Sequence, residues 1–288
     1  MKCFHMVSDS VQCRVHLLKR GGVELNRPVI YAVLIMVSLL HVNVAYSEWY
    51  VGGYGGFNAV QPLKDVTMNT YGYTNAVNRT GFGSTNITAG DTLTQNFKTS
   101  DLSLKQSLLF GGKGGYFFND QGLPWLGIEL DLFTTNPTIK NQTVSTDQDI
   151  RFTPKDLSNP ACPAPLPNNI CAFQQNMKST LPVTETSLRL VTAAFNVVAR
   201  YPGKVFQPYV GIGVGAFYFT SSTGSVQGRQ VVPGLNASAG LKVLMTEEVG
   251  FFLEGKYNRA TLTNFDPTLG LSGEYSAVNF VAGLAYHF

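Results

Sequence analysis

The chain has 288 residues, which is enough for one large domain or two ordinary ones. Only 14% of them are charged, against roughly 25% in an average soluble domain, and 29 glycines, 13 tyrosines and 19 phenylalanines are typical of strands and turns. The formal net charge of +3 lies wholly in residues 1–47, which leaves 21 − 5 = 16 basic and 18 − 2 = 16 acidic residues after them. A balanced remainder lacks the basic footprint that nucleic-acid binding needs, so we expect no nucleic-acid partner.

Residues 1–47 have the order of a secretory signal peptide. Basic residues reach Arg27, an apolar stretch covers residues 29–40, and small residues follow, with Ala45 and Ser47 at positions −3 and −1 of a cleavage after Ser47. The apolar stretch is shorter than the about 20 residues of a membrane helix, so we favour a cleaved signal peptide over an uncleaved anchor. The basic region is unusually long, which leaves the true start codon open.

The exported part, residues 48–288, contains segments of about ten residues in which apolar side chains alternate with small or polar ones. In the cleanest segment, leucines and an isoleucine on one face alternate with Glu129 and Asp131 on the other. This is the pattern of a strand that lies between lipid and a narrow polar interior. Eight such segments are recognised: 48–60, 105–118, 125–135, 185–201, 207–221, 230–245, 249–261 and 275–288.

The connections between these segments alternate between short and long. The short ones are residues 119–124, 202–206 and 246–248, and the long ones are 61–104, 137–184, 222–229 and 262–274. Membrane barrels have short periplasmic turns and long external loops. The sequence therefore predicts an all-β fold, an eight-stranded antiparallel transmembrane β-barrel with long extracellular loops and both chain ends in the periplasm. Ten strands remain an alternative if residues 148–153 and 66–76 pair as a hairpin.

Aromatic residues gather near the ends of the predicted strands. A secreted β-sandwich would not need this arrangement, whereas a membrane barrel uses such residues as girdles at the two lipid interfaces. The residues concerned are Trp49, Tyr50, Tyr116, Phe117, Phe118, Trp125, Tyr201, Phe217, Tyr218, Phe219, Tyr257, Tyr286 and Phe288.

Four stretches carry a family resemblance: EWYVGGYGGFNAV, PYVGIGVGAFYF, GLNASAGLKVLMTEEVGFFLEGKY and NFVAGLAYHF. They resemble strands of the small outer-membrane β-barrels of Gram-negative bacteria, the OmpA-type transmembrane domain and its OmpX-like and opacity-protein-like relatives. The resemblance covers the strands and not the loops. It implies an outer-membrane location, with membrane lipid, lipopolysaccharide and the barrel-assembly machinery as partners, and makes Tyr286 and Phe288 the assembly signal. The chain stops at its last strand, so we do not expect the peptidoglycan-binding role of full-length OmpA proteins.

Some small barrels of this kind are enzymes that use histidine, but after residue 47 the chain has only His287, near its end. No catalytic triad can be built around a lone terminal histidine there, so we predict that the protein is not an enzyme. Cys162 and Cys171 form at most half of a structural zinc site, and we expect neither a metal nor a cofactor. In an oxidising compartment the two cysteines are better explained as a disulfide that braces a proline-rich loop.

Alternation also turns several charged side chains toward the barrel interior. Since unpaired charge is costly there, we expect these side chains to form a salt-bridged plug. Arg189 and Arg200 have opposite parity on one strand, so at least one of them must lie outside the interior. The predicted network consists of Lys113, Glu129, Asp131, Lys242, Glu254 and Lys256.

These patterns favour a structural and surface-interaction role, in envelope integrity or in adhesion to a host or surface ligand through the loops. A small-solute, porin-like pore is the first alternative, in which the plug rearranges to let solutes pass. An OmpW-like carrier of hydrophobic ligands is the second, and it requires an apolar pocket lined by the long loops.

Overall fold

The computed structural model describes residues 48–80, 91–153 and 173–288. The predicted signal peptide and the predicted Cys162–Cys171 disulfide both lie outside the described residues. No helix in the described ranges is long and apolar enough to cross a bilayer.

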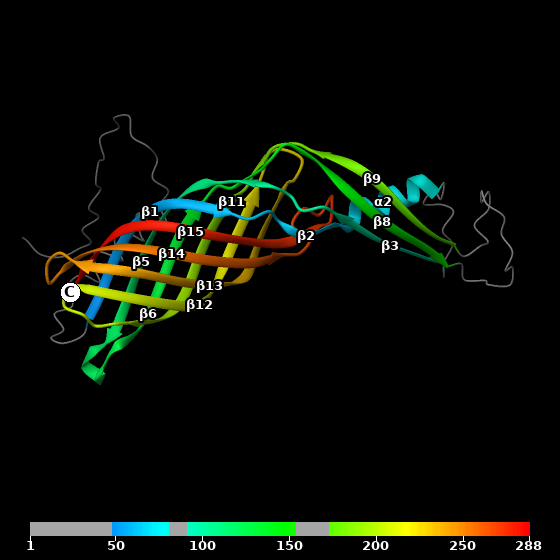
Figure 1. Cartoon of the computed structure of the whole chain (residues 1–288). Helices are drawn as coiled ribbons and strands as arrows, with labels where there is room; N and C mark the ends of the chain where they lie inside the picture. Colours follow the sequence, from blue (N-terminus) through cyan, green and yellow to red (C-terminus); the bar gives the residue numbers. More distant parts are fainter. Residues whose placement is uncertain (1–47, 81–90, 154–172) are drawn as a thin grey trace, which may run out of the picture. The chain divides into compact units, whose positions relative to one another are not determined.

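Eight antiparallel strands form a closed barrel, which confirms the predicted fold (Figure 1). Each barrel strand pairs with the barrel strand that follows it in the chain. The last strand pairs with the first and closes the barrel, with a register that runs from Tyr50 opposite His287 to Val60 opposite Ala277. The strands are β1 (Glu48–Val60), β5 (Ser107–Phe118), β6 (Leu123–Thr135), β11 (Arg189–Arg200), β12 (Phe206–Ser221), β13 (Gly228–Leu244), β14 (Val249–Leu262) and β15 (Leu271–His287).

Successive side chains of each barrel strand point alternately outward and inward. On β12 the outward positions are apolar and open, with Ile212 69% and Val214 63% exposed. The inward positions of neighbouring strands carry polar groups, such as the fully buried Asn196 and Asn236. An apolar exterior around a polar interior is the inverse of a soluble protein and suits a barrel in lipid.

Three short turns and the end of the chain lie at one end of the barrel, which we call the turn end. The turns are the 3-10 helix η1 (Asn119–Gln121) with its following glycine, and residues 201–205 and 245–248. Trp49 and Phe288 exchange backbone hydrogen bonds of 3.2 and 3.0 Å there. We call the opposite end the extension end.

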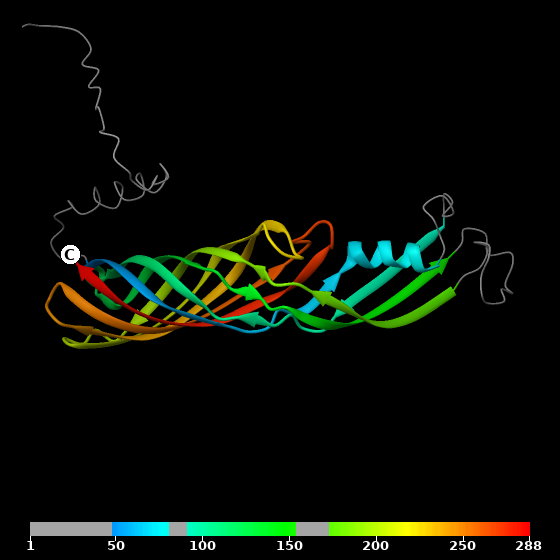
Figure 2. The ribbon, with the colours of Figure 1, turned by 90° about the horizontal axis from the view of Figure 1, so that it is seen from above.

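At the extension end the barrel sheet continues into strands that the two longest connections supply (Figures 1 and 2). The outer part of β15 pairs with β2, and the sheet order continues through β3 and β8 to β9. A small three-stranded sheet lies beside this run, in the order β10, β7, β4. The elements are β2 (Lys64–Met68), α2 (Asn69–Thr80), β3 (Thr92–Thr99), β4 (Leu104–Lys105), β7 (Thr138–Ile139), β8 (Gln142–Thr153), β9 (Phe173–Val183) and β10 (Thr186–Ser187).

The ten-strand alternative is wrong. Residues 148–153 lie in β8, which pairs with β3 and β9 and takes no part in closing the barrel. Of residues 66–76, the first three lie in β2 and the rest form most of the helix α2. The two segments therefore never form a hairpin with each other.

We call the part formed by β2, α2, β3, β8 and β9 the extension, and its four strands the extension sheet. Helix α2 covers one face of this sheet. The Tyr71 ring meets the Phe97 ring edge to face with centroids 5.4 Å apart, and the Gln148 Nε2 group donates a 2.7 Å hydrogen bond to the Gly72 carbonyl. The other face of the sheet is polar and exposed, as at Lys98 and Asp147. Because one face is covered, the strand register is fixed by burial as it is in a soluble domain.

One apolar cluster extends from the extension sheet into the mouth of the barrel. Phe219 and Tyr275, 0% and 1% exposed, lie at its barrel side with ring centroids 5.2 Å apart. The cluster joins the extension to the barrel as one packed body and fills the lumen at this end. Its buried members include Leu63, Val66, Met68, Phe97, Leu102, Leu104, Ile139, Val144, Val183, Leu190, Phe217, Val232, Leu262 and Leu271.

Candidate functional site: the barrel lumen

Five of the six charged side chains predicted for the lumen lie together at its centre. Lys113 of β5 forms ion pairs with Glu254 at 2.6 Å and with Glu129 at 3.3 Å. Lys256 of β14 pairs with Asp131 at 2.6 Å and with Glu254 at 3.3 Å. All five are at most 4% exposed. Strands β5 and β6 supply one side of this central network, and β14 supplies the other side from across the lumen.

Two tyrosines of β1 complete the central network. The Tyr50 hydroxyl donates a 2.6 Å hydrogen bond to Glu129 Oε2, and the Tyr54 hydroxyl donates one to Asp131 Oδ1. The Lys256 ammonium donates to the Tyr54 oxygen at 2.8 Å. Hydrogen bonds of this kind satisfy lone pairs that the ion pairs leave open, as buried charge requires. Three carboxylates against two ammonium groups give the central network a net charge of −1.

Lys242, the sixth predicted residue, stands apart from the central network. Its Nζ atom lies 4.3 Å from the centroid of the Tyr50 ring and 3.2 Å from Nε2 of His287. No described carboxylate lies within 4.0 Å of it.

A second charged cluster closes the lumen at the turn end, and the sequence reasoning missed it. Arg200 bonds to both carboxylate oxygens of Glu48, at 2.5 Å for the longer contact, and the His287 Nδ1 atom lies 2.8 Å from Glu48 Oε1. Strand parity could have identified Arg200 as a lumen residue. Arg200 points inward and is buried, whereas Arg189, of opposite parity on the same strand, points outward and is exposed. Glu48 was missed because the first residue of a strand has little alternation around it.

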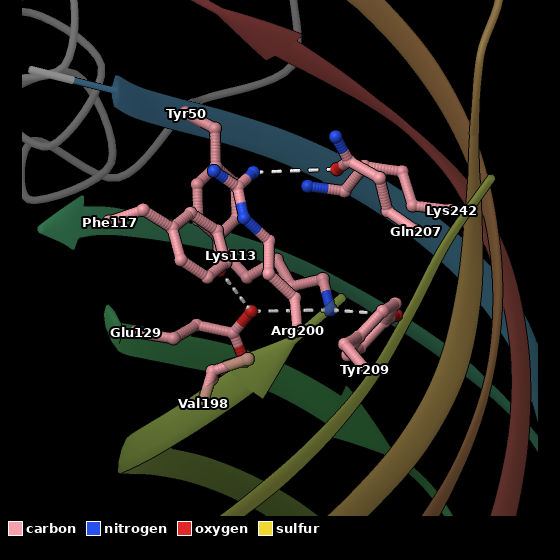
Figure 3. A pocket seen from close by; sticks show the side chains of 9 residues that line it. All are labelled: Tyr50, Lys113, Phe117, Glu129, Val198, Arg200, Gln207, Tyr209 and Lys242. Atoms are coloured by element: carbon pink, nitrogen blue, oxygen red, sulfur yellow. Dashed lines mark hydrogen bonds and ion pairs between the residues drawn. The ribbon is translucent and has the colours of Figure 1, made fainter. Parts of the chain in front are cut away.

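A cavity lies between the two charged clusters, and Figure 3 shows the side chains that line it. The cavity there has a volume of about 10 Å³, which is close to the minimum for one water molecule. It is lined by Tyr50, Lys113, Phe117, Glu129, Val198, Arg200, Gln207, Tyr209 and Lys242.

A belt of asparagines crosses the lumen on the extension side of the central network. Side-chain amides join Asn58 to Asn279 at 2.8 Å, Asn279 to Asn258 at 2.5 Å, and Asn258 to Asn236 at 2.8 Å. Asn236 then donates to Asn196 at 2.8 Å, across the intervening strand β12. Every amide of the belt except that of Asn58 both donates and accepts. Asn58, at one end of the belt, donates through Nδ2, while its Oδ1 atom has no hydrogen-bond partner.

Gly213 allows the belt to pass β12. It lies between Asn196 and Asn236 in the strand register, and a methyl group at this position would overlap the Asn196 amide oxygen and the Phe195 carbonyl oxygen. Gly211 and Gly215 face the same crowded side. Lumen packing thus explains the small residues on this strand.

Comparison with known proteins agrees with this architecture. Residues 32–288 match the family described as the outer membrane protein beta-barrel domain. The chain belongs to this family. No curated protein sequence matches it.

Solved structures similar to this outer-membrane barrel are small barrels of bacteria. Neisserial surface protein A is 11% identical, with a TM-score of 0.43 and coverage of 83% of this chain and 97% of that one. OprG from Pseudomonas aeruginosa is 16% identical, with a TM-score of 0.39 and coverage of 84% and 96%. Ail of Yersinia pestis, solved with a heparin analogue, is 11% identical, with a TM-score of 0.38 and coverage of 85% and 100%.

His287, the only histidine among the described residues, contacts two other side chains of the barrel. His287 lies between Glu48 and Lys242 and is 5% exposed. Within the described ranges, no three residues among histidine, cysteine, aspartate and glutamate are grouped so that they could hold a metal ion.

The aromatic residues divide between the barrel exterior and the lumen. Trp49, Trp125 and Tyr201 are exposed on the outside at the turn end, as a girdle requires. The girdle prediction is wrong for Tyr50, Phe117, Phe217 and Phe219, which point inward and are buried, because strand parity and not nearness to a strand end decides the face.

The two residues predicted as the assembly signal, Tyr286 and Phe288, lie on the outside of the turn end. Their rings stack with centroids 6.2 Å apart and are 42% and 37% exposed. An assembly factor would have access to them there, and their role in assembly stays a prediction.

Proposed function

We propose that this outer-membrane protein is a non-enzymatic, closed scaffold that holds a rigid folded extension at the cell surface for contact with a host or surface ligand. The filled lumen carries the proposal. Charged side chains occupy its turn end and centre, the asparagine belt follows, and the apolar cluster fills the mouth. The interior of a transport barrel would form a passage, whereas packed side chains occupy the interior of this barrel.

The extension supports a presenting role because it is joined to the barrel by strand pairing and by a shared apolar core. Flexible external loops would lack both. The exposed face of the extension carries cross-strand rows of polar side chains, such as Lys98, Asp147 and Lys178. Cavities of about 570 and 380 Å³ on the extension are lined by polar residues of β3, β8 and β9, which suits a polar ligand. Membrane lipid and the barrel-assembly machinery are the other partners that we propose.

Protease shaving of intact cells tests the orientation. The same specific protease site is inserted in segment 154–172 and, in a second variant, in the turn at residues 202–206. We expect cleavage of the first variant in intact cells and of the second only after the outer membrane is opened, because the extension end faces outward and the turn end faces the periplasm. The reverse pattern would overturn the orientation and the presenting role with it.

A small-solute pore is the second candidate, since Lys242 has no carboxylate partner within 4.0 Å among the described residues and lines the cavity between the charged clusters (Figure 3). Planar-bilayer recording of refolded protein separates the two functions. We expect no stable conductance step, because the charged clusters, the asparagine belt and the apolar cluster occupy the described lumen, and the cavity between the charged clusters has a volume of only about 10 Å³. Stable conductance that changes on Glu129→Gln or Lys242→Met would contradict the closed scaffold. The ligand-carrier alternative has less support, because the residues that line the two larger hollows in the described part of the extension are of polar types.

A further inference from the structure

Three cationic side chains line the small cavity between the two charged clusters of the lumen (Figure 3). They are Lys113 of β5, Arg200 of β11 and Lys242 of β13, and Glu129 of β6 is the one carboxylate among the lining residues. All four residues are at most 6% exposed. Formal charges of 3 − 1 = +2 therefore face a space that is shielded from bulk water.

The excess positive charge belongs to Lys242. Lys113 and Arg200 each pair with carboxylates, whereas no described carboxylate lies within 4.0 Å of the Lys242 ammonium group. That group contacts the Nε2 atom of His287 at 3.2 Å and the face of the Tyr50 ring at 4.3 Å. A lysine has three N–H donors, and a buried ammonium group without a counter-charge is costly.

Glu129, the nearest carboxylate on the cavity wall, is already engaged elsewhere. Its Oε2 atom accepts the 2.6 Å hydrogen bond from Tyr50 and lies 3.3 Å from the Lys113 ammonium group. Its Oε1 atom accepts a 3.3 Å hydrogen bond from Asn196. Because both oxygens have partners, the counter-charge for Lys242 has to come from a group that enters the cavity.

Two of the cations are oriented so that one anion can contact both. Figure 3 shows the Lys242 ammonium group pointing toward the Arg200 guanidinium group. The Phe117 ring lies 3.7 Å from the centre of that guanidinium group, and the Tyr50 ring lies beside the ammonium group. Aromatic walls of this kind keep the local polarity low, which strengthens the attraction between opposite charges.

The size of the cavity limits the ligand to a single small ion. Its volume of about 10 Å³ is close to the minimum for one water molecule. A chloride ion is only slightly larger than water. Phosphate and sulfate carry several oxygen atoms around a central atom and are too large for this space.

We propose that this cavity binds one small monovalent anion, with chloride as the natural ligand, between the Lys242 ammonium group and the Arg200 guanidinium group. The anion supplies the counter-charge that Lys242 lacks and joins the turn-end cluster to the central network. The site is internal to the barrel, so it depends neither on the orientation of the protein in the membrane nor on a ligand of the extension.

Urea unfolding of the refolded full-length protein in lipid vesicles tests this site. Sodium chloride is exchanged for sodium gluconate at constant ionic strength and pH, because gluconate is a monovalent anion that is too large for the cavity. For one site, each tenfold rise in chloride above its dissociation constant raises the ratio of folded to unfolded protein about tenfold. We therefore expect the unfolding midpoint to rise with chloride and not with gluconate.

Two variants locate the effect. Lys242→Met should lose the chloride dependence, whereas the matched control Lys105→Met, which removes a half-exposed ammonium group far from the lumen network in the fold, should keep it. Equal stabilisation by chloride and gluconate would overturn the proposal. Chloride dependence that persists in Lys242→Met would also overturn it, because the ion would then bind elsewhere.

A second measurement needs only the wild-type protein, so the test survives a variant that fails to fold. Crystals grown in sodium bromide should show anomalous density for one bromide ion in the cavity, within contact distance of Lys242 and Arg200. An ordered water molecule there would contradict the proposal. Bromide density without a chloride effect on the unfolding midpoint would indicate an adventitious ion only, and would contradict it as well.

Discussion

Replacing Lys256 with methionine is expected to destabilise the barrel by about 3–5 kcal/mol, the cost of leaving buried charge uncompensated. Lys256 is 1% exposed and holds Asp131 and Glu254 through its single ammonium group. Without it, three buried carboxylates share only Lys113. The measurement is the midpoint of urea unfolding in lipid vesicles, followed by the change in gel mobility between folded and heated barrel.

Two control variants show whether charge causes the loss. Lys256→Met/Asp131→Asn returns the central network to a net charge of −1 and leaves an amide oxygen to accept the Tyr54 hydrogen bond, so it should recover most of the stability. Lys105→Met breaks an ion pair with Glu185 in which both side chains are about half exposed, and should cost less than about 1 kcal/mol. If Lys256→Met costs no more than Lys105→Met, the central network does not stabilise the barrel.

Replacing Gly213 with alanine is expected to lower stability by about 1–3 kcal/mol through overpacking. The added methyl group would overlap the Phe195 carbonyl oxygen and push the Asn196 amide away from Asn236, which would break the asparagine belt where it crosses β12. The same unfolding measurement applies, with the yield of folded barrel as a second readout.

Gly53→Ala is the matched control, because nothing lies within 4 Å of a methyl group at Gly53 on the outside of β1. A surface substitution of this kind should change stability by less than about 0.5 kcal/mol. Equal losses for the two variants would mean that backbone effects of glycine, and not the belt, explain the cost at Gly213.

The sequence predicted the strands well because their signal is local. Each barrel strand lies within a few residues of its predicted range, and parity alone placed Lys113, Glu129, Asp131, Glu254 and Lys256 on the inner face. Errors arose where parity was not applied. The girdle prediction used nearness to strand ends, and so included Tyr50 and Phe117, which face the lumen.

The long connections were the least predictable part of the fold. Their strands β3, β8 and β9 alternate polar residues with few apolar ones, because only one face is covered by α2 and the other faces solvent. Pairing of β2 with β15 depends on contacts between residues about 200 positions apart, such as Met68 and Leu271. No local pattern could reveal that the extension continues the barrel sheet.

The sequence by itself determined that eight strands alternate between lipid and a polar interior, and that several charged side chains on these strands turn inward. The tertiary structure decided which of those charges meet. Lys256 pairs with Asp131 across the lumen, 125 positions away in the chain, whereas the Lys242 ammonium lies beside the Tyr50 and Phe117 rings and His287. The physical reason is that alternation fixes the face of each side chain, whereas closure of the barrel fixes which side chains share the interior.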